Sequence, residues 1–198
     1  MEAPSIRFHC FRKNNGGAAN EINSFGVIVG WQFLTNGGVI PCLWYWNGTG
    51  YTAVDLGSLG GNVGQAFGIN NVNKVVGFSL YGGNLHGPGF LWDRWRGLEA
   101  LPLLSPDTDA TVYNINDRGQ IVGDSQTFSD DGELISQRAA IWEHGTVEAL
   151  QTLVPPNTPP LTYESSNIND LGDIAVNATN PDGSPDALLL VPRHRFDR

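Results

Sequence analysis

The amino-acid sequence predicts a single all-β domain, in which four tandem four-stranded units close into a four-bladed β-propeller. Three observations lead to this fold class. The chain has 198 residues and 40% hydrophobic content, which supplies one core. Twenty-five glycines and twelve prolines, against 16% charged residues, favour many short strands joined by tight turns. The third observation is an internal repeat of the length of one propeller blade.

The repeat is marked by an Ile-Asn pair that recurs at Ile22, Ile69, Ile115 and Ile168, with successive offsets of 47, 46 and 53 residues. These pairs define units at 19–62, 63–109, 110–160 and 161–192 within one domain, 1–198. In each unit we expect antiparallel strands A (around the Ile-Asn pair), B (valine- and isoleucine-rich), C and D. Strand C ends at Trp46, Trp92, Trp142 and Leu190, and packing between blades is favoured over sugar platforms for these tryptophans.

The connection from strand A to strand B has the residues of a tight turn. Three residues after the asparagine of each pair stand Gly26, Asn73, Gly119 and Gly172. Glycine and asparagine tolerate a positive φ, so the pattern predicts four hairpins. The paired residues themselves, Asn23, Asn70, Asn116 and Asn169, are predicted to cap these hairpins rather than to bind a ligand.

The fourth unit lacks a strand D after Leu190. Phe8 precedes Ile22 by 14 residues, as Asp55 in the first strand D precedes Ile69. We therefore expect an N-terminal strand at residues 5–11 to complete the fourth blade and close the ring. Closure removes exposed sheet edges. A flat or solenoidal stack of the units is the competing architecture.

Three segments carry a family resemblance: INDRGQIVG at 115–123, GFLWD at 89–93 and DLGSLGG at 55–61. They resemble the units of the HAF-type extracellular repeat family, and the likeness extends over nearly the whole chain. It implies repeated, propeller-like β units and an extracellular location. The histidine of the family's motif is replaced here by Cys42, Pro88, Arg138 and Asp186. The resemblance implies no particular activity.

The charge of the chain excludes several partners. A formal net charge of −9 repels nucleic acid and anionic lipid, which need Lys or Arg to neutralise phosphate. No apolar run is long enough to span a membrane, and the first residues lack the pattern of a signal peptide, so we expect a soluble chain.

The two cysteines, Cys10 and Cys42, are too few for a disulfide framework or a closed zinc site, so buried thiols are favoured. The two can form a disulfide only if the first strand lies beside the first blade.

One face of the predicted ring carries the B-to-C loops and the D-to-A connections. The B-to-C loops differ in length and composition, and variable loops on a uniform scaffold commonly bind ligands. This face also collects acidic residues: Asp107, Asp109, Asp130, Asp131, Glu133, Glu164, Asp182 and Asp186. Solvated loops are favoured over a cation-attracting mouth, with Ca²⁺ as a weak possibility. We predict no other metal and no cofactor.

Polar residues on the inner strands are the candidate ligand-binding set. Glu21, Asn114 and Asn167 precede the repeated isoleucine, with Gly68 breaking the pattern. Gln65, Thr111, Tyr113 and Glu164 lie nearer the loop face. Buried polar groups need partners, which a ligand or ordered water along the axis supplies. His86 in a loop and Trp31 outside the repeated tryptophan position complete the set. For Trp31, packing at the rim is favoured over contact with a ligand.

These features favour a ligand-binding module that holds a small molecule, glycan or peptide at the loop-rich face and channel mouth. A small propeller enzyme, such as a lyase, hydrolase or cyclase, is the alternative, with Glu21, Glu164 and His86 as acid and base. The histidines occupy four different positions in their repeats, so no catalytic arrangement stands out. A protein-interaction scaffold is the third hypothesis.

Overall fold

The structure is a computed structural model that describes residues 16–83, 86–129, 131–162 and 167–193. The first unit contains β1 (Gly17–Ile22), β2 (Ile28–Phe33), β3 (Val39–Trp46) and β4 (Tyr51–Asp55). The second contains β5 (Gly60–Ile69), β6 (Val75–Tyr81), β7 (Gly89–Asp93) and β8 (Gly97–Ala100). The third contains β9 (Asp109–Ile115), β10 (Ile121–Phe128), β11 (Leu134–Glu143), β12 (Thr146–Ala149) and the short helix α1 (Leu150–Leu153). The fourth contains β13 (Asn167–Ile168), β14 (Ile174–Thr179) and β15 (Pro185–Leu190).

The all-β prediction and the order of strands within the units are confirmed. Each unit is an antiparallel meander in which strand A pairs with B and B pairs with C. Strand C pairs with D in the first three units. A single parallel pair, Val39 with Val63, joins the sheets of the first two units, while the third and fourth units form separate sheets.

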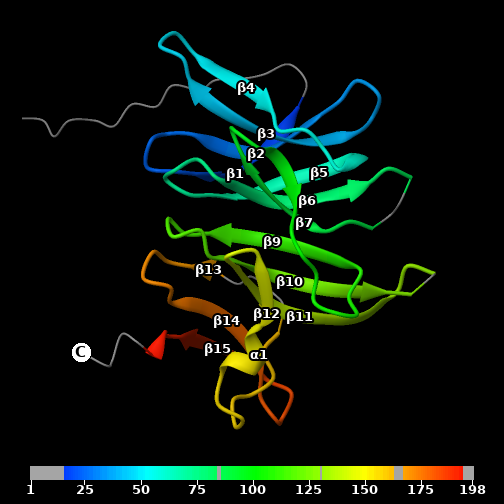
Figure 1. Ribbon diagram of the computed structural model, residues 1–198, viewed down its shortest axis with the longest axis vertical. Coiled ribbons are helices and arrows are strands. Elements are labelled where there is room, and N and C mark those ends of the chain that lie inside the picture. Colours follow the sequence, from blue (N-terminus) through cyan, green and yellow to red (C-terminus); the bar gives the residue numbers. More distant parts are fainter. Residues whose placement is uncertain (1–15, 84–85, 130, 163–166, 194–198) are drawn as a thin grey trace, which may run out of the picture.

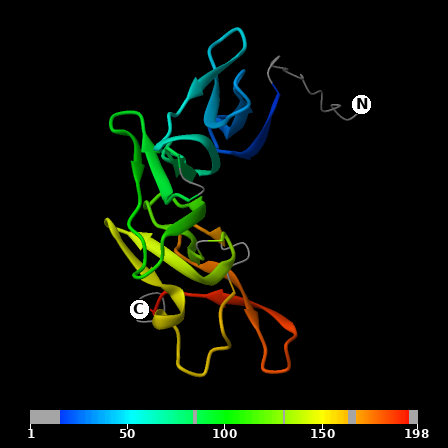
Figure 2. The same ribbon diagram turned by 90° about the vertical axis from the view of Figure 1, so that its right-hand side faces the viewer.

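The four units follow one another in a row (Figures 1 and 2). Their first strands are neighbours in sequence order, since β1 contacts β5, β5 contacts β9 and β9 contacts β13. The first and fourth units lie at opposite ends of this row. None of the sheets formed by the described residues closes on itself, so a closed four-bladed ring is not confirmed. Residues 5–11, which we expected to close the ring, lie outside the described residues.

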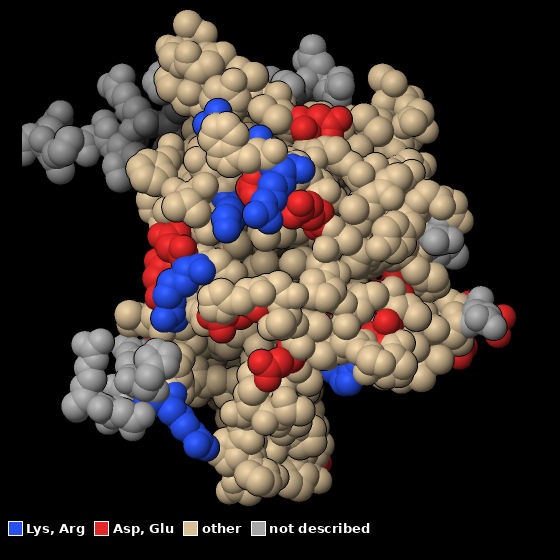
Figure 3. All heavy atoms as spheres, viewed as in Figure 1, with Lys and Arg blue, Asp and Glu red and all other residues tan. Residues whose placement is uncertain are grey.

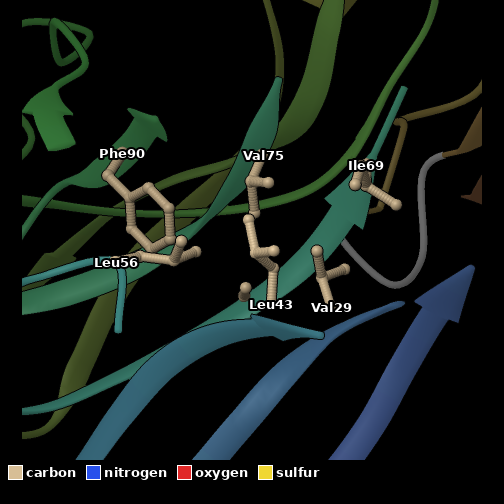
Figure 4. Packing of buried hydrophobic residues seen from close by; sticks show 7 residues of the cluster. Val29, Leu43, Leu56, Ile69, Val75 and Phe90 are labelled. Carbon is tan, nitrogen blue, oxygen red and sulfur yellow. The ribbon is translucent and has the colours of Figure 1, made fainter. Parts of the chain in front are cut away.

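The hydrophobic core is divided among the three interfaces between units. At the first interface, Val29 and Leu43 of the first unit pack against Ile69, Val75 and Phe90 of the second (Figure 4). A second cluster joins the second and third units, and a third joins the third and fourth. Each sheet therefore buries its apolar side chains against its neighbours in the row, which is the packing of a repeat array.

The predicted turns are confirmed. The residues three positions after the paired asparagines have positive φ: 76° at Gly26, 60° at Asn73, 82° at Gly119 and 84° at Gly172. The capping prediction is confirmed as well. Asn23 Oδ1 accepts hydrogen bonds from the backbone N–H groups of Phe25 and Val27, both at 3.0 Å. The other three asparagines accept from the residues two and four positions on in the same way.

The repeated tryptophans pack between units where a preceding unit exists. Trp142 is 2% exposed in the second cluster and donates from Nε1 to the carbonyl oxygen of Pro102 at 2.7 Å. Trp92 packs against the first cluster. Trp46 belongs to the first unit, and half of its surface is exposed.

Two smaller predictions concern cysteine and membrane insertion. Cys42 is fully buried in β3, and Cys10 lies outside the described residues. No helix within the described ranges has the length and apolar character needed to cross a membrane.

Candidate functional site

The strand ends define two edges of the row. The A-to-B turns form what we call the turn edge, at 23–26, 70–73, 116–119 and 169–172. The B-to-C loops form the loop edge, at 34–38, 82–88, 129–133 and 180–184. In Figure 1 the A-to-B turns lie at the left, and the B-to-C loops of the first three units lie at the right. The loop edge is the face on which we expected a binding site.

The loop edge holds a buried carboxylate that faces a histidine. Asp109 begins β9, and its Oδ1 accepts a hydrogen bond from the backbone N–H of Gly87 at 2.8 Å. Its Oδ2 accepts from the hydroxyl of Thr108 at 2.6 Å. His86 Nδ1 lies 3.2 Å from Oδ1, and the imidazole also packs against the ring of Phe128. Asp109 thus connects the second unit's loop to the start of the third unit.

A second buried carboxylate binds an arginine close by. Asp107 Oδ2 lies 2.8 Å from Arg138 Nη2 and accepts from Nε at 3.2 Å, while its Oδ1 accepts from the Thr127 hydroxyl at 2.8 Å. Asp107 and Asp109 are both buried. Neither lies in a solvated loop, and both have protein donors at both oxygens, so they serve as structural clamps rather than as an open cation mouth.

The remaining acidic residues of the loop edge are exposed. Asp131, Glu133 and Asp186 are exposed, and Asp182 accepts hydrogen bonds from Ser184, which hold the pKa of its carboxyl below the usual value. Asp130 and Glu164 lie outside the described residues. Acidic atoms stand out at the right-hand edge of Figure 3, on a surface that is otherwise mostly uncharged. Among the described residues, no three His, Cys, Asp or Glu side chains come together as metal ligands.

A third carboxylate, Asp124, lies inside the third unit on β10 and is fully buried. Its Oδ2 accepts hydrogen bonds from Gln126 Nε2 and Gln137 Nε2, both at 2.6 Å, and from the Tyr113 hydroxyl at 3.4 Å. Its Oδ1 has no hydrogen-bond partner in the described part of the chain. Burial raises the pKa of Asp124 to about 6, although hydrogen bonds from Gln137, Tyr113 and Gln126 act in the opposite direction.

Aromatic side chains continue from Asp124 into the second unit. The ring of Tyr113 lies 5.8 Å from that of Phe67, and the ring of Phe67 is stacked on Phe78 at 5.9 Å. Phe67 and Tyr113 stand at the irregular positions of β5 and β9, where the register with strand B shifts. A row of three half-buried aromatic rings therefore leads to the buried carboxyl group. We call Phe67, Phe78, Tyr113, Asp124, Gln126 and Gln137 the inner site.

Three of the predicted ligand-binding residues belong to this region. Tyr113 is part of the inner site. Thr111 is paired directly with Asp124 across β9 and β10, and Gln65 is paired with Phe78 across β5 and β6. Directly paired residues project to the same side of an antiparallel sheet. The predicted residues lie on β5 and β9, which are two of the five strands that contribute to the inner site.

Glu21 and His86 lie apart. Glu21 Oε2 accepts a hydrogen bond from the backbone N–H of Ile69 at 2.6 Å, so Glu21 joins the first two units near the turn edge. Burial raises its pKa, and this hydrogen bond opposes the rise. His86 lies at the other end of β6, whose length separates the two by about 20 Å. The structure therefore does not bring these two candidate catalytic residues together.

The other predicted residues are dispersed. Asn114 is half-buried on β9, and Asn167 is exposed on β13. Trp31 on β2 packs edge-on against Phe33, with ring centroids 5.0 Å apart. Neither asparagine is part of the inner site.

The prediction missed Asp124 and its two glutamine partners, although the sequence held a signal. After the Val-Gly pair of strand B, the first two units have an aromatic residue, Trp31 and Phe78. The third unit has Asp124 there. An acid that replaces an aromatic residue in the middle of a strand is unusual and needs a physical reason.

Comparisons with known proteins give this chain no family. A scan against models of protein families finds no match, and a search of curated proteins finds none.

Proposed function

We propose that this chain is a ligand-binding module, and that its inner site holds a small polar ligand rich in hydroxyl groups, such as a glycan. The observation that carries the proposal is the Asp124 carboxyl group, which is buried with one oxygen lacking a hydrogen-bond partner among the described residues. A buried acceptor without a donor destabilises a fold by about 1 to 3 kcal/mol, and such groups in native proteins commonly have a functional reason.

The chemistry of the inner site favours a ligand that donates hydrogen bonds. Gln126 and Gln137 already donate to Oδ2. The oxygen that lacks a partner among the described residues is therefore Oδ1, which in the ionised carboxylate accepts hydrogen bonds. A ligand hydroxyl or amine supplies that donor. Gln126 and Gln137 are only half-buried, so rotation of their side chains opens a path to Asp124.

The aromatic row fits the other half of such a ligand. Sugar rings combine hydroxyl groups with an apolar face of C–H groups, and the faces of Phe67, Phe78 and Tyr113 offer apolar contact next to the carboxyl. Ligand sites of this kind are mostly apolar with a few convergent polar groups. A neutral or cationic ligand also agrees with the net charge of −9.

The finer architecture belongs to the same proposal. The likeness to the HAF-type repeats and the blade-like meanders support a propeller-type scaffold that presents variable loops along one edge. The extracellular setting that the likeness implies is compatible with a glycan ligand. A peptide or another small molecule with several donors is a further candidate for the same site.

Saturation-transfer NMR with a panel of monosaccharides and short oligosaccharides tests this function. We expect at least one panel member to receive saturation from the wild-type protein. In Asp124→Asn the amide nitrogen takes the position of the unpaired oxygen and replaces an acceptor with a donor, so the signal is expected to fall by about tenfold or more. Asp131→Asn makes the same charge change at an exposed position and is the matched control.

Two results contradict the proposal. One is that no sugar on the panel binds the wild-type protein. The other is that Asp124→Asn binds as well as Asp131→Asn, because the ligand then does not use the buried carboxyl.

A second candidate function is an enzyme that uses His86 as an acid or base, as a lyase, hydrolase or cyclase does. The observation in favour is the pairing of His86 Nδ1 with Asp109, which orients the imidazole and leaves Nε2 for proton transfer. Turnover of a substrate with a bell-shaped pH profile, lost in His86→Ala and retained in His144→Ala, supports this function. Unchanged turnover in His86→Ala excludes His86 as the acid or base.

A further inference from the structure

The contact between successive units has two distinct faces. The upstream face of a unit, which meets the preceding unit, carries the repeated isoleucine of strand A. The isoleucines of the second, third and fourth units are buried there, with exposed fractions of 4% for Ile69, 5% for Ile115 and 8% for Ile168. Ile22 has no preceding unit in the described chain and is 59% exposed. Among the described residues, no unit lies against the upstream face of the first unit.

The same face of the first unit carries aromatic surface. Trp46 occupies the strand C position of Trp92 and Trp142, which pack against the preceding unit. In the first unit this side chain is 50% exposed, compared with 2% for Trp142. Ile22 marks an apolar surface whose equivalent, the repeated isoleucine, is buried at each of the other interfaces.

The fourth unit presents the opposite, downstream face. Ala139 and Ile141 of β11 belong to the cluster that faces the fourth unit. Ala187 and Leu189 occupy the corresponding positions of β15, where Ala187 is exposed and Leu189 is 65% exposed. Each end of the row is thus one half of an interface whose other half lies at the opposite end.

A ladder of hydrogen bonds crosses every interface at the turn edge. The side-chain amide of each paired asparagine donates to the carbonyl oxygen of the next: Asn23 to Asn70 at 3.1 Å, Asn70 to Asn116 at 3.0 Å and Asn116 to Asn169 at 2.9 Å. Every bond of the ladder runs from the side-chain amide of one unit to the carbonyl oxygen of the next unit. The amide of Asn169 at one end of the row is therefore the kind of donor that the carbonyl oxygen of Asn23 at the other end would accept from.

A second set of bonds repeats one residue later. The backbone N–H of Ser24 donates to Asn71 Oδ1 at 2.9 Å, that of Asn71 to Asp117 Oδ1 at 2.7 Å and that of Asp117 to Asp170 Oδ1 at 2.8 Å. By the same geometry, the N–H of Asp170 at one end of the row matches the hydroxyl oxygen of Ser24 at the other. The two ends are complementary in hydrogen bonding as well as in apolar surface.

We propose that a second copy of this chain docks head to tail, with its first unit against the fourth unit of the first copy. The interface continues the contact that the chain makes three times within itself. Asn169 of one copy donates to the carbonyl oxygen of Asn23 in the next, and Leu189 packs against Ile22. Such a heterologous contact closes into a ring or continues as an open filament, depending on the rotation between copies.

Cross-linking between the two ends separates this proposal from closure within one chain. Ser24→Cys and Asp170→Cys are each prepared with Cys10→Ser and are treated with a short bismaleimide. A mixture of the two variants is expected to give a cross-linked dimer, whereas each variant alone is not, because a head-to-tail contact never places identical residues together. In one chain, Ser24→Cys with Asp170→Cys is expected to cross-link between molecules, with a yield that rises with concentration.

Three outcomes overturn the proposal. Cross-linking within single, dilute molecules of the double variant shows a ring closed by one chain. Equal cross-linking of each single variant with itself shows a symmetric dimer. Absence of cross-links at high concentration shows that the ends do not meet.

The mass in solution provides a second test. Light scattering over a concentration series is expected to rise from the 21.4 kDa of one chain towards multiples of it. Ile22→Glu and Leu189→Glu are expected to weaken association by about tenfold or more, because each places a charge in the apolar contact. Val72→Glu introduces the same charge at an exposed turn away from both ends and is expected to associate as the wild type does. A constant 21.4 kDa at every concentration overturns the proposal.

Discussion

The turn edge and the loop edge are built from the same strands, but they use their polar residues differently. Along the turn edge one hydrogen-bonding pattern is repeated at all three interfaces. Along the loop edge the interactions are individual, such as the Asp107–Arg138 pair and the Asp109–His86 pair. The difference shows how a repeat protein separates two tasks: a uniform edge sets the spacing of the units, and a variable edge is left to diversify.

Removal of a central member of the Asn ladder is expected to have the largest effect. Asn116→Ala loses two turn-capping bonds, the bond to the Gln120 side chain and the bond to the carbonyl oxygen of Asn169. Because Asn116 is buried, the free energy of unfolding is expected to fall by about 3 kcal/mol. At protein concentrations where the chain is monomeric, Asn169→Ala loses the equivalent turn bonds but no bond to a following unit, and a loss smaller by about 1 kcal/mol is expected. Urea denaturation measures both; equal losses mean that the ladder adds nothing between units.

The buried carboxyl of the third unit is expected to make stability depend on pH. Burial raises the pKa of Asp124 in the folded state to about 6, above its usual value of 3.8, so the folded state holds the proton more tightly than the unfolded state. Its stabilising contribution is complete below pH 4 and is lost as the pH rises through 6. Asp124→Asn removes this loss, so the variant gains on the order of 2 to 3 kcal/mol relative to the wild type between pH 4 and 7.

Denaturant unfolding of both proteins at pH 4, 5, 6 and 7 measures this effect. The difference between the two proteins isolates Asp124 from the other titrating groups. A difference that stays constant with pH contradicts the shifted pKa.

The smallest effects are expected from exposed aspartates, where the two edges are compared directly. Asp117 on the turn edge accepts hydrogen bonds from the backbone and side chain of Asn71. Asp117→Ala is expected to lower the free energy of unfolding by about 1 kcal/mol. Asp131→Ala on the loop edge is expected to change it by less than about 0.5 kcal/mol. Thermal melting of both variants tests this ranking. Equal decreases in melting temperature would contradict the expected difference between the turn edge and the loop edge.

The sequence predicted what is encoded within a unit. The turn positions at Gly26 and Asn73 could be recognised because positive φ restricts the residue type. The capping role of Asn23 could be recognised because its partners lie two and four residues away. Both inferences depend on local geometry, which a repeat shows several times.

Contacts that depend on how strands pair or on how neighbouring units pack were harder to predict. The second role of Asn23, as a donor to Asn70, depends on how adjacent units pack. The burial of Asp107 depends on Arg138, 31 residues later, and the isolation of Glu21 from His86 depends on the length of β6. Asp124 was missed because its glutamine partners are recognisable only once β10 and β11 are paired in register. The sequence of β10 alone marks Asp124 as an acid where the first two units have an aromatic residue, but it does not show which side chains bind the carboxyl group.

The division of the core among the three interfaces has a consequence for how the molecule opens. Within the described residues each inner unit packs against two neighbouring units and each end unit against one, so we expect the domain to behave as a one-dimensional chain of coupled elements rather than as a single cooperative block. Local opening should then begin at the ends and move inward. Amide hydrogens of β6 and β10 should exchange with solvent most slowly, and those of β1 and β15 should exchange first.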